Sequence, residues 1–298
     1  MLKISMVLLL AFLIGGCQKE EEVQQLTIEP VEILDNQPTT VNEQNDTQGE
    51  LWGYQPRQPW TQIDYATLNE DGFAYEIYDD PDISSEILTL NEASDSRVLF
   101  FTFDDAPQEP DSYALEIAQT LKAHDVNAVF LVNGMYLKSD KGREITRQVH
   151  EMGFEIGNHT TTHPFLHELS YDEQYSELLI TNELIEEITQ DRVRWFRPPF
   201  GSYNLDTVHA ANELGLQLIT WTFGYDWMDE YLESTALTHI SLTTDHLKAG
   251  ANVLMHDRPW TLKALPQIIQ GYRQQGYHIV DPYIIKHQKN STIVHGSN

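Results

Sequence analysis

The sequence predicts an α/β fold in which β/α units repeat around a parallel sheet. From Arg97 onward, short apolar runs of strand length alternate with longer amphipathic stretches of helical period. Polar and charged residues directly follow several of these runs, as in parallel β/α barrels, where the loops after the strands build the active site. A chain of 298 residues can bury one large core, and we expect one main domain.

The chain begins with a targeting segment. Lys3 precedes an apolar run at 6–14, which is too short to cross a bilayer as a stable helix. The run ends in two glycines and Cys17, and this ending resembles the lipobox of bacterial lipoproteins, in which the cysteine is lipidated. We predict that residues 1–16 are a lipoprotein signal peptide and that Cys17 carries the lipid. The alternative is an ordinary secretory signal. Cys17 is the single cysteine, so no intramolecular disulfide is possible.

Two segments separate Cys17 from the main domain. Residues 17–50 are polar and acidic with almost no aromatic residues, so we expect a flexible tether that cannot bury enough apolar surface to fold. Aromatic residues return in 51–96, which we interpret as an ordered N-terminal extension. The whole chain has 46 acidic and 18 basic residues and a net charge of -28. Such a surface repels phosphates, which excludes nucleic acid as a partner and favours a neutral substrate or one that becomes cationic on reaction.

The main domain is expected at residues 97–290, with seven strands. They are 98–103, 128–132, 154–156, 193–196, 216–222, 252–255 and 278–280. Between the third and fourth strands, residues 171–189 place apolar side chains on one helical face. This spacing predicts an amphipathic helix whose apolar residues belong to the core.

Residues with metal-binding and acid-base chemistry follow two of these strands. Asp104 and Asp105 end the first strand; taken alone, such a pair is most simply a surface turn. His159 and His163 follow the third strand, where a glycine, three threonines and a closing proline favour a loop over a helix. With Asp105, the two histidines offer two nitrogens and one oxygen, a donor set suited to Zn²⁺ or a similar divalent ion with open positions for water and substrate.

Three further strand ends carry candidate functional residues. Arg197 precedes two prolines, which cannot continue a central strand and must form a fixed exit turn. Asp226 and Trp227 follow the fifth strand, and His256 follows the sixth. A histidine in that position could equally be a core residue with its hydrogen bonds satisfied.

Together these segments resemble the polysaccharide deacetylases, the NodB-homology domain of carbohydrate esterase family 4. The resemblance extends from residue 98 to 280, and five segments follow the order of the family's motifs. They are 102–107, 159–163, 197–201, 226–227 and 254–256. The resemblance implies a distorted (β/α)7 barrel, similar to a TIM barrel, and this agrees with the seven expected strands.

The resemblance also implies a site built around one divalent metal ion, with zinc expected and cobalt or nickel as alternatives. By position in the motifs, Asp105, His159 and His163 hold the metal. Asp104 is the general base, and Arg197 pairs with it and aims it.

The remaining motif residues are implied to serve the acyl group and the leaving amine. His256 protonates the amine, and Asp226 orients His256. The backbone N–H of Phe200 faces the oxyanion of the tetrahedral intermediate. Trp227 and Leu254 form the apolar walls that seat the acetyl methyl.

The chain departs from the family pattern at two positions. The family usually has glycine where this chain has Ala106, and a positive φ at that position would make the methyl cost about 1 kcal/mol. The fourth motif usually carries a second aspartate upstream of Asp226, where this chain has Gly224 and a tighter spacing. This second departure puts the network of arginine and base in question.

The expected function is metal-dependent removal of acetyl groups from a polysaccharide or oligosaccharide that contains N-acetylglucosamine. Peptidoglycan, chitin-type chains and poly-N-acetylglucosamine all remain open. The alternatives are an O-acetyl esterase acting on acetylated xylan and a non-catalytic glycan-binding lipoprotein. A non-haem iron oxygenase also uses two histidines and one carboxylate, but its close His-x-Asp pair is missing among these residues.

The expected location follows from the lipid anchor. We predict a monomer tethered to a membrane outside the cytoplasm, acting at the cell envelope. Gln18 stands where an aspartate would favour retention in the inner membrane, so the outer membrane is preferred where the cell has one.

Overall fold

The computed structural model describes residues 60–78, 85–288 and 290. The predicted signal peptide, Cys17 and the tether at 17–50 lie outside the described residues. None of the helices in the described part of the chain is long and apolar enough to cross a membrane.

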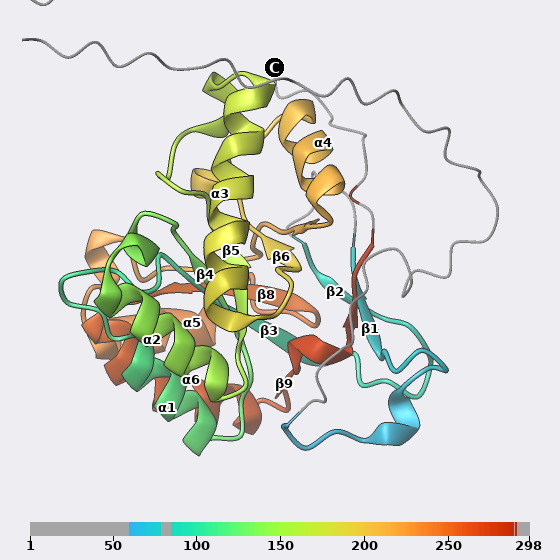
Figure 1. Ribbon diagram of the computed structural model, residues 1–298. Helices are drawn as coiled ribbons and strands as arrows, with labels where there is room; N and C mark the ends of the chain where they lie inside the picture. The colour runs from blue at the N-terminus through green and yellow to red at the C-terminus, as the bar shows by residue number, and fades with distance from the viewer. Residues whose placement is uncertain (1–59, 79–84, 289, 291–298) are drawn as a thin grey trace, which may run out of the picture. The chain divides into compact units, whose positions relative to one another are not determined.

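The main sheet consists of seven parallel strands, one for each strand expected from the sequence (Figure 1). They are β3 (Val98–Asp104), β4 (Val129–Val132), β5 (Glu155–Asn158), β6 (Trp195–Phe196), β7 (Gln217–Leu218), β8 (Ala251–His256) and β9 (His278–Ile279). Their order is β7-β6-β5-β4-β3-β8, and β9 pairs with the start of β3. All seven residues of β3 are buried, as expected for a strand with neighbours on both sides and both faces covered.

The fifth expected strand is shorter than predicted and changes its neighbour along its length. Its first part, β7, pairs with β6. Further on, the N–H of Thr222 donates to the carbonyl of Asn252 at 2.8 Å, and Phe223 forms a parallel bridge to Val253. The segment therefore joins the two edges of the sheet and closes it into the distorted barrel that the sequence resemblance implied.

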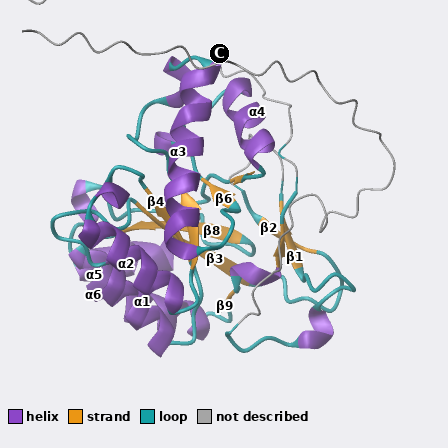
Figure 2. Cartoon of the chain, in the orientation of Figure 1, coloured by secondary structure: helices purple, strands orange, loops and turns teal. Residues whose placement is uncertain are grey.

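Six α-helices in the described part of the chain cover the outside of the barrel (Figures 1 and 2). They are α1 (Ala114–Ala123), α2 (Asp140–Glu151), α3 (Tyr171–Thr189), α4 (Leu205–Leu214), α5 (Ser234–Thr243) and α6 (Pro259–Gln274). Each contacts the next in the spatial order α5, α6, α1, α2, α3, α4. Their apolar faces bury side chains such as Ile117, Leu178 and Ile268 against the strands, and each such burial stabilises the fold by about 1.5–3 kcal/mol.

Helix α3 has the bounds predicted from its apolar spacing. It begins with a capping box, in which the Ser170 side chain accepts from the N–H of Glu173 and the Glu173 carboxylate accepts from the N–H of Ser170. Its last residue is Thr189, and the C-cap residue Gln190 has the left-handed conformation with φ 58°. Local signals at both ends therefore reinforce the apolar periodicity.

The described part of the N-terminal extension forms a second, three-stranded sheet with the C-terminal region. Its order is β10 (Ile285–Lys286), β1 (Tyr75–Ile77) and β2 (Ile87–Thr89). The N–H of Ile87 donates to the carbonyl of Gly250 at 2.8 Å. Gly250 has φ +80°, and a Cβ there would lie 2.3 Å from the carbonyl oxygen of Ile87, so only glycine allows this close approach. The extension thus packs against the start of β8.

Candidate active site

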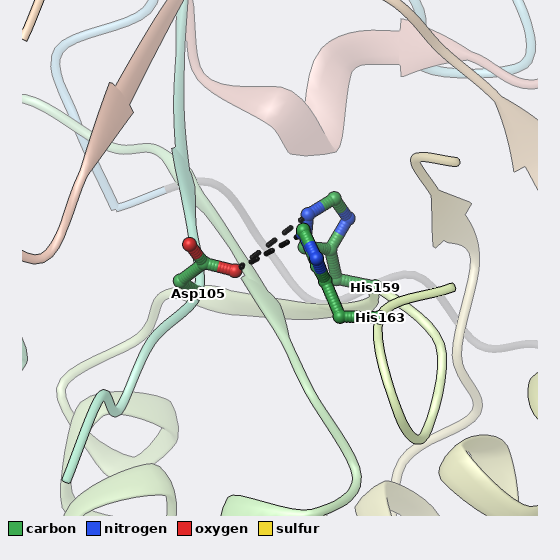
Figure 3. A group of neighbouring side chains, drawn as sticks. All are labelled: Asp105, His159 and His163. Carbon is green, nitrogen blue, oxygen red and sulfur yellow. Dashed lines mark ion pairs between the residues drawn. The ribbon is translucent and has the colours of Figure 1, made fainter. Parts of the chain in front are cut away.

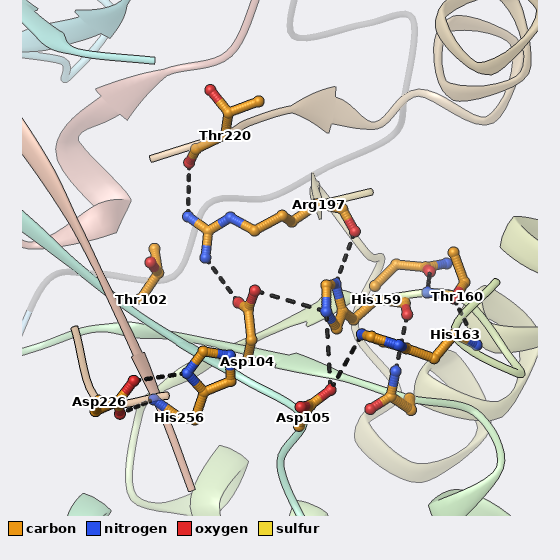
Figure 4. A network of polar contacts seen from close by, with 12 residues as sticks. Thr102, Asp104, Asp105, His159, Thr160, His163, Arg197, Thr220, Asp226 and His256 are labelled. Atoms are coloured by element: carbon orange, nitrogen blue, oxygen red, sulfur yellow. Dashed lines mark hydrogen bonds and ion pairs between the residues drawn. The ribbon is translucent and has the colours of Figure 1, made fainter. Parts of the chain in front are cut away.

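The predicted functional residues gather at the carboxyl ends of the parallel strands. Asp104 is the last residue of β3, His159 follows β5, Arg197 follows β6 and His256 is the last residue of β8. Figure 4 shows their side chains converging on one region. This is the end of a parallel barrel at which loops assemble catalytic groups.

Three of these side chains form a group with metal-binding geometry (Figure 3). One ligand atom from each of Asp105, His159 and His163 lies within 4.8 Å of the other two. Asp105 Oδ1 is 3.8 Å from His159 Nε2 and 3.5 Å from His163 Nε2. Two imidazole nitrogens and one carboxylate oxygen are ligands that Zn²⁺ accepts readily, so the group fits a divalent transition metal.

The protonation of the histidines suits metal binding. His159 Nδ1 lies 2.8 Å from the carbonyl oxygen of Arg197, so Nδ1 donates a hydrogen bond there and Nε2 is the ring nitrogen that faces Asp105. Burial lowers the pKa of His163, and the nearby His159 adds to this effect, while Asp105 and Asp104 oppose it. His163 is therefore held in the neutral form that a metal ligand requires.

The segment that carries the two histidines is a loop, as predicted. Thr160 and His163 both have left-handed backbone conformations, with φ 65° and 62°. The N–H of His163 donates to Thr160 Oγ1 at 3.1 Å. Glu177 on α3 accepts from the N–H groups of Thr161 and Thr162, each at 2.8 Å. Glu177 was not identified from the sequence, because a glutamate in an amphipathic helix gives no local sign that it holds a distant loop.

Asp104 is buried against an arginine beside this group. Only 2% of Asp104 is exposed and Arg197 is fully buried. Arg197 Nη1 donates to Asp104 Oδ1 at 2.7 Å, while Asp104 Oδ2 lies 3.6 Å from His159 Nε2. Arg197 thus fixes one oxygen of Asp104 and leaves the other facing the candidate metal group.

A second carboxylate-containing pair, in which the carboxylate is buried, lies on the other side of Asp104 in Figure 4. Asp226 Oδ1 is 2.7 Å from His256 Nδ1, and Thr261 Oγ1 donates to Asp226 Oδ2 at 2.6 Å. Burial opposes the charged forms of both partners, but their mutual attraction and hydrogen bonds raise the pKa of His256 and lower that of Asp226. The pair therefore favours the protonated form of His256 together with the ionised form of Asp226.

Exposed aromatic residues border these polar groups. Trp227 is 43% exposed, and its ring centroid lies 5.2 Å from that of His256. Phe200 is 56% exposed, with φ 59°, and lies 4.6 Å from His163 between ring centroids. Leu254 is buried on β8 two residues before His256, so both side chains point to the same face of the strand. These are the positions expected of residues that line a substrate site.

The two departures from the family pattern leave this arrangement in place. The left-handed conformation belongs to Asp105, with φ 63°, and not to Ala106. Ala106 is buried in the core and its methyl group carries no penalty of this kind. A Cβ at Gly224 would lie 2.4 Å from the Leu254 carbonyl oxygen and 2.6 Å from the Trp227 ring, so no aspartate fits there. Arg197 pairs with Asp104 nevertheless.

This parallel barrel carries at its strand ends a candidate metal group, a buried carboxylate and a histidine paired with a second carboxylate, which are groups that hydrolytic enzymes use. Comparisons with known proteins agree with this class. The family model for polysaccharide deacetylases matches residues 91–219. A peptidoglycan-N-acetylglucosamine deacetylase of Bacillus cereus is 28% identical over 200 residues, which are 65% of this chain and 90% of that protein. A chitooligosaccharide deacetylase of Azorhizobium caulinodans is 27% identical over 207 residues, or 64% of this chain and 93% of that protein.

A solved structure is also similar to this chain. A pseudoenzyme of carbohydrate esterase family 4 from Bacillus anthracis is 33% identical, with a TM-score of 0.56. The match covers 61% of this chain and 63% of the pseudoenzyme, so this chain spans slightly less than two thirds of that protein's length. The chain is therefore similar to the polysaccharide deacetylases in both sequence and fold.

Proposed function

We propose that this protein is a metal-dependent deacetylase that removes acetyl groups from a glycan containing N-acetylglucosamine. The observation that carries the proposal is the placement of the Asp104–Arg197 pair beside the candidate metal group, with the Asp226–His256 pair on the other side of Asp104. Relatives named as deacetylases of peptidoglycan and chitooligosaccharide support N-acetylglucosamine as the substrate unit.

The metal ion would be held by Asp105, His159 and His163, and zinc suits this donor set. When bound, such an ion supplies Lewis acidity, which acidifies a bound water and polarises the acetyl carbonyl.

Asp104 is placed to accept the proton of the attacking water. Its Oδ2 faces the metal group, whereas Oδ1 is held by Arg197 at 2.7 Å. As the water oxygen bonds to the acetyl carbon, its proton passes to Oδ2. The carbonyl oxygen gains negative charge in this step, and the backbone N–H of Phe200 is proposed to stabilise it.

His256 is placed to complete the reaction by protonating the leaving nitrogen. An amide nitrogen leaves poorly as an anion, so the C–N bond breaks only when a proton is delivered to it. Asp226 holds His256 Nδ1, which leaves Nε2 free to donate. The products are acetate and an amine, and the amine becomes cationic on a protein with net charge -28.

Acetate release from a panel of substrates tests this function. The panel contains peptidoglycan, chitin oligomers, poly-N-acetylglucosamine and acetylated xylan, each with added Zn²⁺, Co²⁺ or Ni²⁺ and with chelator. We expect release from an N-acetylglucosamine substrate that chelator abolishes and metal restores. Asp104→Asn should bind metal yet lose at least about 100-fold in kcat, because it removes the general base. Release from xylan alone would favour an O-acetyl esterase.

The similarity to a pseudoenzyme makes a non-catalytic glycan-binding protein the second candidate. This chain has the proposed base, three metal ligands and acid together, and this combination argues for activity. The two candidates differ in one measurement, because a binding protein retains glycan in a pull-down but releases no acetate with any of the three metals.

We also propose that the protein is a lipoprotein anchored through Cys17 to a membrane outside the cytoplasm, with the outer membrane or a periplasmic face preferred and the glycan of the cell envelope within reach. The support is the apolar segment that ends in two glycines and this cysteine. Cys17→Ala should move the protein from the membrane fraction to the soluble fraction and abolish labelling with a palmitate analogue. A variant that remains with membranes and keeps the label would exclude Cys17 as the lipidated residue.

A further inference from the structure

Arg197, which aims the proposed base, is itself oriented by neutral acceptors that the sequence did not reveal (Figure 4). Its Nη1 donates to Asp104, whereas Nη2 donates to the carbonyl of Thr220 at 2.8 Å and to Asn252 Oδ1 at 3.3 Å. Its Nε has no hydrogen-bond partner among the described residues. The direction of the guanidinium therefore depends on the partners of Nη1 and Nη2.

Asn252 is fully buried on β8 and forms hydrogen bonds with both Arg197 and the Thr220 carbonyl. Its Nδ2 donates to the carbonyl of Thr220 at 3.0 Å, and its Oδ1 also accepts from Thr102 Oγ1 at 3.3 Å. If the amide were turned over, Nδ2 would face the donors of Arg197, so the hydrogen bonds define its orientation. Asn252 thus places an acceptor where Nη2 needs one and also holds the second acceptor, the Thr220 carbonyl.

The Thr220 carbonyl is supported from the opposite side by the N-terminal extension. Ser85 Oγ accepts from the N–H of Thr220 at 2.8 Å and lies 3.3 Å from Thr220 Oγ1. Only 6% of Ser85 is exposed. Two residues later, Ile87 donates to the Gly250 carbonyl, which ties this part of the extension to the start of β8. Ser85 therefore fixes the residue whose carbonyl receives Arg197.

We infer that Asn252 and Ser85 are positioning residues, which act through Thr220 to hold Arg197 in the orientation that aims Asp104. This inference rests on the proposed deacetylase function. It also gives the N-terminal extension a part in catalysis, since Ser85 precedes the region that matches the family model. Geometry of this kind matters because displacing a catalytic group by about 1 Å can cost about 100-fold in rate.

Ser85→Ala tests the contribution of the extension, with Ser94→Ala as its matched control. Ser94 is a buried serine of the same extension, 8% exposed, and its Oγ donates to the carbonyls of Ala74 and Thr67. Both variants lose one buried hydroxyl. We expect Ser85→Ala to lower kcat by about 10-fold with KM unchanged, and Ser94→Ala to leave both constants unchanged.

Asn252→Leu tests the asparagine, with Asn290→Leu as its matched control. Thr102 keeps its hydrogen bond to the Val253 carbonyl in Asn252→Leu, so the variant should still fold. Asn290 is a buried asparagine that bonds the Leu216 carbonyl, and no hydrogen bond joins it to Arg197. We expect kcat to fall by about 10- to 100-fold in Asn252→Leu only. Asn252→Asp keeps an acceptor for Nη2 and should recover part of the loss.

A measurement independent of activity reads the orientation of Arg197 directly. With ¹⁵N-labelled arginine, the buried and hydrogen-bonded Nη protons of Arg197 should exchange slowly with water. The signals are assigned by their absence in Arg197→Lys. We expect Ser85→Ala and Asn252→Leu to shift these signals and speed their exchange, and Ser94→Ala and Asn290→Leu to leave them as in the wild type.

The outcomes separate this inference from the proposed function. If the wild-type protein releases no acetate from any substrate, the proposed function fails, while the arginine signals still show whether Ser85 and Asn252 orient Arg197. If the wild type is active but folded Ser85→Ala and Asn252→Leu keep its kcat and its arginine signals, the inference is wrong. It is also wrong if the two control variants show the same changes.

Discussion

Asp226 holds His256 at two points. Its Oδ1 lies 2.7 Å from Nδ1 of the imidazole, and its Oδ2 accepts the backbone N–H of His256 at 2.6 Å. Asp226 is fully buried, so its charge acts on the imidazole with little screening by water. One carboxylate therefore fixes the direction of the imidazole ring and favours its protonated form.

The first prediction concerns the pH dependence of activity in Asp226→Asn. Attraction to Asp226 raises the pKa of His256 against the opposing effect of burial. A proton donor works below its pKa, so activity should fall as the pH rises through the pKa of His256. Removing the negative charge lowers that pKa, so the alkaline limb of the profile of kcat/KM against pH should move to lower pH. We also expect kcat to fall about 10-fold or more, because the ring loses its orientation.

Asp257→Asn is the control for this shift. Asp257 is a buried carboxylate next to His256 in the chain, but it accepts hydrogen bonds from Ser112 and from the N–H of Gln108 instead. Its alkaline limb should stay at the wild-type pH. An unmoved limb in Asp226→Asn would show that another group donates the proton.

The second prediction distinguishes a metal ligand from a neighbouring histidine. His163→Gln removes one of three donors, whereas His167→Gln removes a histidine that is hydrogen-bonded to Ser202 Oγ at 2.6 Å. Loss of residues that merely support a ligand costs about 10- to 100-fold in metal affinity, so loss of a ligand should cost at least about 100-fold. Titration calorimetry with Zn²⁺ should give this loss for His163→Gln and wild-type affinity for His167→Gln. Equal affinities would exclude His163 as a ligand.

The third prediction concerns Ala106, where the family usually has glycine. The left-handed residue is Asp105 and not Ala106, so Ala106→Gly relieves no backbone strain. Ala106 is only 1% exposed. The variant loses a buried methyl and makes the unfolded chain more flexible. We expect the free energy of unfolding in urea to fall by about 1 kcal/mol. A more stable Ala106→Gly variant would indicate strain at this position.

The fold was predictable where local signals and burial agree. The run that forms β3 is apolar from Val98 to Phe101 because both faces of the strand are covered, and α3 has a capping box at its first turn as well as an apolar face. The second sheet was not predictable in this way. Its strands contain two or three residues each, and β1 pairs with β10, which lies about 210 positions later in the chain. No local pattern in the sequence therefore indicates this sheet.

The site was predictable where a residue type is rare and chemically distinctive. Histidines and paired carboxylates that follow strands stand out, and their order along the chain follows that of the motifs in the polysaccharide deacetylases. Asn252, Thr220 and Ser85 do not stand out, because neutral polar residues occur throughout the chain and their importance lies in contacts. Ser85 and Thr220 are 135 positions apart. Only the closed barrel, with the extension packed on it, brings them to Arg197.

The fourth prediction concerns an ion pair at the beginning of β5 and β6. Arg194 Nε donates to Glu155 Oε2 at 3.0 Å, its Nη2 donates to Oε1, and Trp195 Nε1 donates to Oε2 at 2.8 Å. Both charged residues are buried. Arg194→Met leaves a buried carboxylate without its cation, which typically costs about 3–5 kcal/mol. We expect a loss of this size in the free energy of unfolding at pH 7.

The pH dependence and a double variant identify the buried charge as the cause. Burial raises the pKa of Glu155 even beside Arg194, and without Arg194 nothing of that strength opposes it. A group with a raised pKa in the folded state stabilises below its ordinary pKa of about 4.3, and this stability is lost as the pH rises through the folded-state value. The stability of Arg194→Met relative to wild type should therefore fall from pH 4 to pH 7. Adding Glu155→Gln to Arg194→Met removes the charge but keeps an acceptor for Trp195, so the double variant should be more stable at pH 7 than Arg194→Met.

The contrary result would be that the single and the double variant lose the same amount of stability relative to wild type at every pH. Lost packing, and not the unpaired carboxylate, would then be the cause.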